Sequence, residues 1–129
     1  MKTSARDPRV YLQDILSAIA LIEEYTYEDK QFFCVDTKTQ DAVLRQISII
    51  GEAAAKLSSS LKVKHPEIPW KNIVGMRNIV VHDYSKTNIP AVWIVVERDL
   101  PVLRHAIQEM LKEIADENPT VLKMPPAHR

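Results

Sequence analysis

Apolar residues recur every three or four positions along most of this chain, which is the spacing of a helix with one buried face. The first such stretch covers residues 6–27, where Asp7 is suited to cap a helix and Pro8 to begin it. Its predicted buried face consists of Leu12, Ile15, Leu16, Ile19 and Ile22. We expect a connector after it, with Phe32 and Phe33 folded back onto the core.

The second stretch, residues 37–61, has the most regular pattern. Thr37 followed by Gln40 fits a capping box at the start of a helix. The apolar seam that follows consists of Val43, Ile47, Ile50, Ala54, Leu57 and Leu61. So regular a seam is typical of an antiparallel bundle or of a dimer interface. Gly51 lowers helix stability, so we expect it to mark a close contact with another helix.

Two further helices are predicted. A polar, proline-containing loop over residues 58–69 leads to a short third helix that starts at Pro69 and carries residues 75–84. After a break, Asn88 is a candidate cap for a final helix over residues 90–117. The apolar stripe of that helix consists of Val92, Val96, Leu100, Leu103, Ile107, Met110 and Ile114. Pro101 lies inside this helix and removes a backbone hydrogen bond, which predicts a kink or a split.

These elements, without strand-like alternation or internal repeats, predict an all-α fold. The expected architecture is an up-and-down bundle of four helices, or five if Pro101 splits the last. The length of 129 residues suits one domain with one core. We expect the domain to cover residues 1–118 and an extended tail to cover residues 119–129.

The composition narrows the classes of function. The formal net charge is zero at pH 7, so any binding to nucleic acid has to come from a local patch. The chain has no glycine-rich phosphate loop and no cysteine and histidine cluster with zinc spacing, so no cofactor or metal is predicted. The small side chain of its one cysteine, Cys34, is expected to be half-buried. No stretch approaches the roughly 20 apolar residues of a membrane span, which favours a reduced, cytoplasmic protein.

One stretch, GMRNIVVHDY at residues 75–84, combines helical spacing with groups that can do chemistry. These groups are Arg77, Asn78, His82, Asp83 and Tyr84. On one ideal helix, Arg77 and His82 would lie about 140° apart, because they are five residues apart. They can converge if the helix frays after Val81, or if a second chain places its own copy opposite. The spacing therefore favours a site that two chains share.

The pair has a direct chemical use. His82 can act as a general base or acid near neutral pH, and Arg77 can bind phosphate oxygens. Such a pair without a carboxylate cluster suits metal-independent cleavage of RNA, in which the 2′-hydroxyl attacks the neighbouring phosphorus. DNA lacks that nucleophile. Tyr84 adds a hydroxyl that can bind phosphate or be modified. The alternative is a polar helix end, where cations interact favourably with the helix dipole.

Other polar and aromatic residues give weaker signals. Three lone histidines are expected to face solvent: His65, His105 and His128. Two tryptophans are expected to anchor the core rather than stack on bases: Trp70 and Trp93. A weakly basic run, usually a solvated face although it could guide RNA, consists of Lys56, Lys62, Lys64 and His65. Glu52 either pairs with Arg77 or faces water.

Three segments between residues 7 and 116 resemble the HepT-like branch of the HEPN superfamily. They are AVLRQISIIGEAAAKLS, HPEIPWKNIVGMRNIVVHDY and IPAVWIVVERDLPVL. The most specific element is the pattern Arg-x4-His-x-Tyr, which is matched here by Arg77, His82 and Tyr84. The polar residue that usually follows the arginine is present as Asn78, and Asp83 occupies a variable position.

The resemblance implies an α-helical homodimer whose two motifs face each other across a cleft. It implies the toxin of a toxin–antitoxin system, a metal-independent endoribonuclease in which Arg77 and His82 cleave RNA and leave a 2′,3′-cyclic phosphate. The implied partner is a minimal nucleotidyltransferase antitoxin that neutralises the toxin by adenylylating Tyr84. Some members of the superfamily are instead non-catalytic modules that bind nucleotides or a nucleotidyltransferase. A dimerisation domain with a purely structural motif is a third interpretation.

Overall fold

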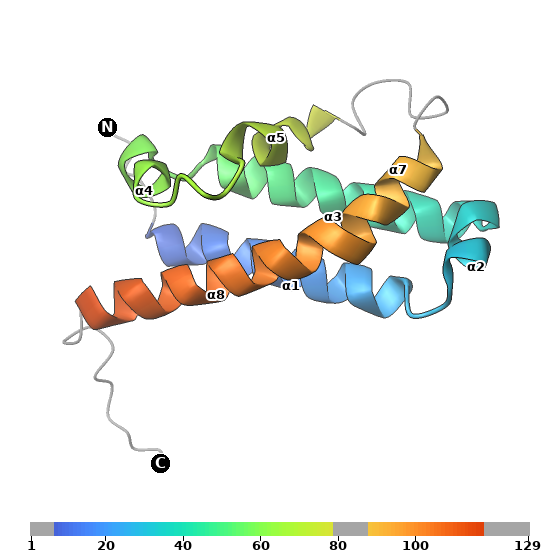
Figure 1. Ribbon diagram of the computed structural model, residues 1–129, viewed down its shortest axis with the longest axis horizontal. Helices are drawn as coiled ribbons and strands as arrows, with labels where there is room; N and C mark the ends of the chain where they lie inside the picture. Colours follow the sequence, from blue (N-terminus) through green and yellow to red (C-terminus); the bar gives the residue numbers. More distant parts are fainter. Residues whose placement is uncertain (1–6, 79–87, 118–129) are drawn as a thin grey trace, which may run out of the picture.

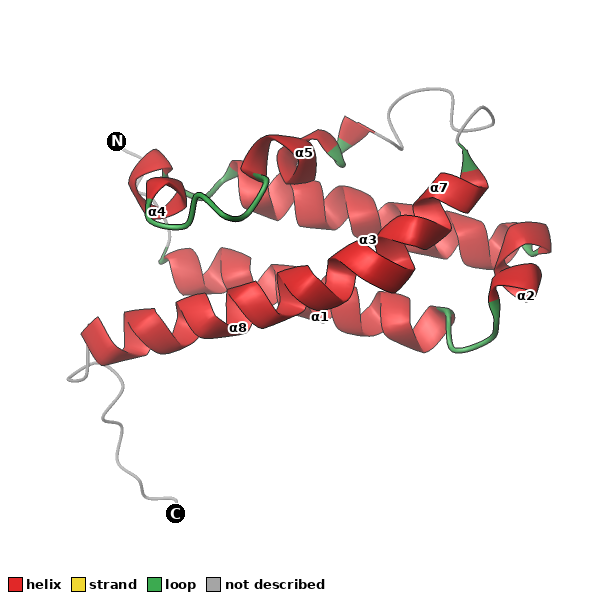
Figure 2. Cartoon of the chain, viewed as in Figure 1, coloured by secondary structure: helices red, strands yellow, loops and turns green. Residues whose placement is uncertain are grey.

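The computed structural model describes residues 7–78 and 88–117, and every regular element in these ranges is helical (Figure 1, Figure 2). The elements in chain order are α1 (Pro8–Tyr25), α2 (Lys30–Val35), α3 (Thr37–Ala55), α4 (Ser59–Val63), α5 (Trp70–Gly75), α7 (Ile89–Ile94), the π-helical segment η2 (Val95–Asp99) and α8 (Leu100–Glu117). The prediction of an all-α fold is confirmed.

The three long helices form the body of the molecule. In Figure 1, α1 and α3 run antiparallel beside each other, and α8 crosses them in the same sense as α3. The short helices α4 and α5 make the third arm of the bundle, and α5 packs on α3. The chain therefore runs up, down, up and down as predicted, although the third arm is built from short pieces.

Helix α1 follows the sequence pattern closely. The Asp7 carboxylate accepts a hydrogen bond from the backbone N–H of Arg9 at 2.9 Å, and Pro8 occupies the first turn. The cap and proline therefore act as predicted. Four of the five predicted core residues are completely buried, namely Leu12, Ile15, Ile19 and Ile22. Leu16 is only partly buried and packs against the edge of this core.

The start of α3 differs from the prediction. Asp36 caps the helix by accepting the backbone N–H of Thr39 at 3.0 Å, so the predicted capping box of Thr37 and Gln40 is wrong. The Gln40 amide instead donates to the backbone carbonyl of Phe33 at 2.9 Å. That carbonyl belongs to α2, a helix formed inside the segment predicted as a plain connector. Gln40 is therefore used to join α2 to α3.

Only one of the two connector phenylalanines belongs to the core. Phe33 is 1% exposed, whereas Phe32 is 40% exposed. Their different burial follows from α2, because adjacent residues on a helix point about 100° apart. The prediction that both rings fold back is therefore right for Phe33 and wrong for Phe32.

Helix α3 ends at Ala55, although its apolar seam continues to Leu61. Ser58 accepts the backbone N–H of Leu61 at 3.2 Å and so starts the separate helix α4. Leu57 is buried and Leu61 half-buried across this break. The apolar spacing therefore continues across the turn between α3 and α4. The prediction of one helix over residues 37–61 is wrong.

The last arm is continuous but irregular. Asn88 caps α7 through a hydrogen bond from the N–H of Ala91 at 3.1 Å, as predicted. The break expected at Pro101 lies just before it, in η2, where the N–H of Leu100 bonds to the carbonyl of Val95. Because Pro101 has no N–H and its ring crowds the preceding turn, the helix widens there into a π-helical segment.

The tryptophans and the cysteine occupy the predicted environments. Trp70 and Trp93 are half-buried and pack against the core. The ring of Trp93 lies against Phe33, with 5.4 Å between the ring centroids, which joins α7 to α2. Cys34 is half-buried and forms no disulfide. No helix within residues 7–78 and 88–117 is both long enough and apolar enough to span a membrane.

Candidate functional site

The chain reaches Arg77 through the short helix α5. The indole N–H of Trp70 donates to the backbone carbonyls of Lys62 and His65, at 3.2 Å and 3.0 Å. Ile73, one turn further on, is buried in the core. These contacts fix α5 at its first residue and along its inner face.

Arg77 lies in the turn that follows α5. The helix ends at Gly75, and the N–H of Arg77 bonds to the carbonyl of Val74, three residues back, at 3.2 Å. A bond across three residues is the tighter pattern found at helix ends. The prediction that one helix from Pro69 carries the whole motif is therefore wrong, because α5 ends before Arg77. The angle calculated for one ideal helix no longer applies to this pair.

A close contact between α3 and this turn holds the Arg77 backbone. A Cβ atom added at Gly51 would lie 2.4 Å from the Arg77 backbone nitrogen and 3.0 Å from its Cα. Only a residue without a side chain leaves room for such an approach. The predicted close contact at Gly51 is confirmed, and its partner is the arginine of the motif.

The polar residues around this contact are partly placed. Arg77 is half-buried and Asn78 is exposed. Glu52 is also exposed, and among the described residues there is no ion pair between Glu52 and Arg77. Of the two alternatives for Glu52, the structure favours a side chain that faces water.

Three members of the motif fall outside the described residues. His82, Asp83 and Tyr84 lie within residues 79–87, between the two described ranges. The approach of His82 to Arg77, and the position of the Tyr84 hydroxyl, therefore stay predictions. The structure establishes how one half of the expected pair is held.

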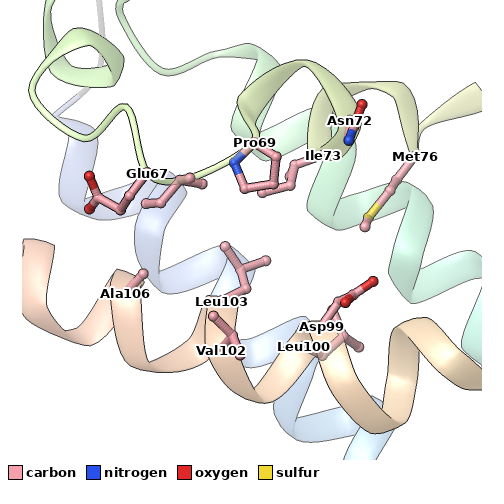
Figure 3. A pocket seen from close by; sticks show the side chains of 11 residues that line it. Glu67, Pro69, Asn72, Ile73, Met76, Asp99, Leu100, Val102, Leu103 and Ala106 are labelled. Atoms are coloured by element: carbon pink, nitrogen blue, oxygen red, sulfur yellow. The ribbon is translucent and has the colours of Figure 1, made fainter.

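A hollow of about 250 Å³ lies between α5 and α8 next to the Arg77 turn (Figure 3). Met76 lines one end of it, and its floor is apolar, with Ile73 and Leu103 among the lining side chains. Glu67 and Asp99 add carboxylates to the lining. An apolar floor with acidic groups repels phosphate, so this hollow is unsuited to the backbone of RNA.

His65 is not the solvent-facing residue that the sequence predicted. It is 8% exposed, its Nε2 atom lies 3.0 Å from Glu113 Oε1, and its Nδ1 atom lies 3.4 Å from Glu67 Oε2. Glu113 belongs to α8 and is 48 positions further along the chain, a contact that no local pattern reveals. His105 is exposed as predicted, and His128 lies outside the described residues.

The predicted basic run is interrupted. His65 turns inward, and Lys64 pairs with Glu117 at 3.7 Å. Lys56 is exposed, and Lys62 is half-buried. The run is therefore not a continuous cationic face. In the two described ranges, no group of three or more His, Cys, Asp or Glu side chains is arranged to hold a metal ion.

Comparison with known proteins places the chain in a family. A family model described as "Ribonuclease HepT-like" matches residues 15–110, which include both Gly51 and the motif at residues 75–84. A relative named "Probable ribonuclease HepT", from Thermococcus cleftensis, is 41% identical over 114 residues, which cover 87% of this chain and 100% of that protein.

Two further relatives show how the matched region occurs elsewhere. In Methanocaldococcus jannaschii, a "Gamma-glutamylcyclotransferase and putative RNase" is 39% identical over 110 residues, which cover 84% of this chain but 50% of that protein. A "Putative RNase" of Caldanaerobacter subterraneus subsp. tengcongensis is 32% identical over 112 residues, covering 84% of this chain and 97% of its own length. No solved structure matches the chain significantly. The chain belongs to the HepT-like family of the HEPN superfamily.

Proposed function

We propose that this protein is a metal-independent endoribonuclease in which Arg77 and His82 carry the cleavage. The observation that carries the proposal is the fixed position of the Arg77 backbone, which packs against Gly51 inside the region of the family match. The ribonuclease names of the relatives support the same activity. A fixed arginine is what a phosphoryl transition state requires, because its charge is stabilised best by groups that are already in place.

The proposed reaction is an internal attack within RNA. His82 removes the proton of a 2′-hydroxyl, the 2′-oxygen forms a bond to the adjacent phosphorus, and the bond from phosphorus to the 5′-oxygen breaks. The leaving 5′-oxygen takes a proton from an imidazolium, and the other product carries a 2′,3′-cyclic phosphate. Arg77 stabilises the charge on the phosphate oxygens through paired N–H donors. DNA, which has no 2′-hydroxyl, is not a substrate.

We place this site in a cleft between two copies of the chain. Such a cleft would gather two copies of Arg77 and two of His82, which is the arrangement that the resemblance to the HEPN superfamily implies. A second chain also supplies the acid for the leaving group when the first His82 has taken its proton. Homodimerisation is therefore part of the proposal, and it is measured directly by analytical ultracentrifugation.

The proposed biological role is that of a toxin in a toxin–antitoxin system. Its partner is a minimal nucleotidyltransferase antitoxin that transfers AMP to the hydroxyl of Tyr84. The added phosphate brings negative charge and bulk beside a site built to receive a phosphate of RNA, so it blocks substrate binding. An intact-mass gain of one AMP after co-expression with the nucleotidyltransferase, absent in Tyr84→Phe, tests this step.

The experiment that tests the activity is RNA cleavage in excess EDTA by the wild type and by Arg77→Ala and His82→Ala. We expect the wild type to cut and each variant to lose at least about 100-fold in rate. A chain that cuts no RNA at any pH but binds a nucleotide would support the alternative, a non-catalytic nucleotide-binding partner of a nucleotidyltransferase. Equal cleavage by all three proteins would rule out the assignment of Arg77 and His82.

A further inference from the structure

The contact between α3 and the Arg77 turn has a consequence for catalysis. We propose that Gly51 is a positioning residue, whose missing side chain sets the place from which Arg77 reaches the phosphate. This inference rests on the proposed role of Arg77 in RNA cleavage. Gly51 itself touches the backbone of Arg77 and takes no part in the chemistry.

Backbone conformation does not explain a glycine at this position. Neither Gly51 nor Gly75 has a positive φ, so any residue can adopt the conformation at position 51. Gly51 lies inside α3, where alanine would favour the helix more than glycine does. The reason for glycine is therefore the space that it leaves, and that space is filled by the Arg77 backbone.

The contact has little freedom to relax. The atoms nearest to a Cβ at position 51 are the backbone nitrogen, Cα and Cβ of Arg77, rather than the end of a flexible side chain. On the side of α3, Ile50 and Ala54 are 0% exposed, and the helix packs along α1. The Arg77 turn, by contrast, follows a helix of only six residues. A methyl group at position 51 therefore displaces the turn rather than α3.

The size of the displacement follows from the distance. A Cβ 2.4 Å from the Arg77 nitrogen has to move away by about 1.0 Å to reach ordinary van der Waals contact at 3.4 Å. A misplacement of about 1 Å is enough to reduce the rate of a positioned reaction by about 100-fold. We expect Gly51→Ala to lower kcat by about that factor and to change KM little, because the substrate contacts away from Arg77 remain.

Gly75→Ala provides a matched control. Gly75 lies two residues before Arg77, and within residues 7–78 and 88–117 no neighbouring atom lies within 4 Å of a Cβ added there. The substitution adds the same methyl group close to Arg77 in the sequence, at the last residue of α5. We expect Gly75→Ala to keep kcat within about threefold of the wild type, since its methyl group meets none of the described neighbours.

The decisive experiment is a double-mutant cycle on the full chain, with single-turnover RNA cleavage as the measurement. If Gly51 acts only through Arg77, Gly51→Ala lowers the rate in the wild type but causes no further loss in Arg77→Ala. A further loss of tenfold or more in Arg77→Ala would overturn the proposal, because Gly51 would then act elsewhere. Normal cleavage by Gly51→Ala with strong loss in Arg77→Ala would reject the inference and keep the proposed function. Normal cleavage by Arg77→Ala would reject the proposed function itself.

A measurement on the wild type covers the case in which Gly51→Ala does not fold. Backbone amide exchange of Arg77 reports whether its N–H, bonded to the Val74 carbonyl and packed on Gly51, is held in place. We expect protection comparable with that of the α5 amides. Exchange at the rate of an unprotected amide would contradict the proposal, as would a folded Gly51→Ala with unchanged kcat.

Discussion

Replacing His65 by alanine tests how the segment before α5 is attached to α8. The imidazole is 8% exposed and lies between two carboxylates, at 3.0 Å from Glu113 and 3.4 Å from Glu67. Glu113 comes from α8, whereas Glu67 comes from the loop that leads into α5. The ring therefore joins the segment that leads to α5 and Arg77 to α8, the longest helix of the last arm.

The magnitude can be estimated from these contacts. The two glutamate side chains are 55% and 66% exposed, so water screens both interactions and each contributes only about 0.2–1 kcal/mol. Removing a buried ring also leaves space that the neighbours fill incompletely, which costs about 1–2 kcal/mol more for a small side chain. We expect His65→Ala to lower the free energy of unfolding by about 2–3 kcal/mol.

Urea denaturation followed by circular dichroism measures this change, provided that the slope of the transition stays the same. His105→Ala is the matched control, because His105 is an exposed histidine of the same α8 that Glu113 belongs to. We expect that control to change stability by less than about 0.5 kcal/mol. A loss of less than about 0.5 kcal/mol in His65→Ala would refute the role assigned to the buried ring.

Two further predictions concern the fixed ends of helices. Trp70→Phe keeps an aromatic side chain but removes the pyrrole part of the indole, with the N–H that donates to the carbonyls of Lys62 and His65. We expect a loss of about 1–2 kcal/mol in the same denaturation assay, and no loss would contradict the anchoring role. The hydrogen bond from the Thr39 hydroxyl, followed by that from the Thr39 backbone N–H, holds the pKa of Asp36 below its ordinary value. Because the pKa of Asp36 is lower in the folded than in the unfolded protein, the ionised carboxylate stabilises the fold above about pH 4. This stabilisation is lost as the pH falls through the folded-state pKa, so Asp36→Asn should lose less stability than the wild type between about pH 5 and 3. Equal losses in the two proteins would exclude this contribution.

The sequence predicts those parts of the fold that depend on neighbouring residues. Asp7, Pro8 and the buried face of α1 were found from spacing and capping alone, as was Asn88 at the start of α7. The effect of Pro101 was also foreseen, because a missing N–H disturbs a helix wherever it occurs. Its form, a π-helical segment over Val95–Asp99, depends on packing that spacing does not encode.

The predictions from sequence are wrong where two local signals compete, or where a residue distant in the sequence determines a contact. Asp36 and Thr37 were both able to cap α3, and the carboxylate prevailed while Gln40 bonded to α2. Ser58 started a new helix although the apolar spacing continued past it. The prediction that His65 faces solvent is wrong because its partner Glu113 is distant in the sequence.

The candidate site shows the same division. Gly51 could be recognised as a contact point, since a glycine inside a strong helix needs a reason. That its partner is the Arg77 backbone could not be read from the sequence, because the contact depends on how α5 crosses α3. Residue types alone mark residues 75–84 as a candidate site, whereas their assignment to RNA cleavage depends on the resemblance to a family. The comparison confirms membership of that family over residues 15–110.

The proposed cleavage of RNA by Arg77 and His82 without a metal is tested most directly by the masses of the fragments formed in EDTA. The measurement uses one RNA oligonucleotide, the wild type, Arg77→Ala and a substrate with a single 2′-deoxy substitution at the cut position. We predict fragments ending in a 2′,3′-cyclic phosphate from the wild type, cleavage slower by at least about 100-fold in Arg77→Ala, and no cut at the substituted position of the 2′-deoxy substrate. Fragments with 5′-phosphate ends, cleavage at the 2′-deoxy position, or unchanged cleavage by Arg77→Ala would contradict it.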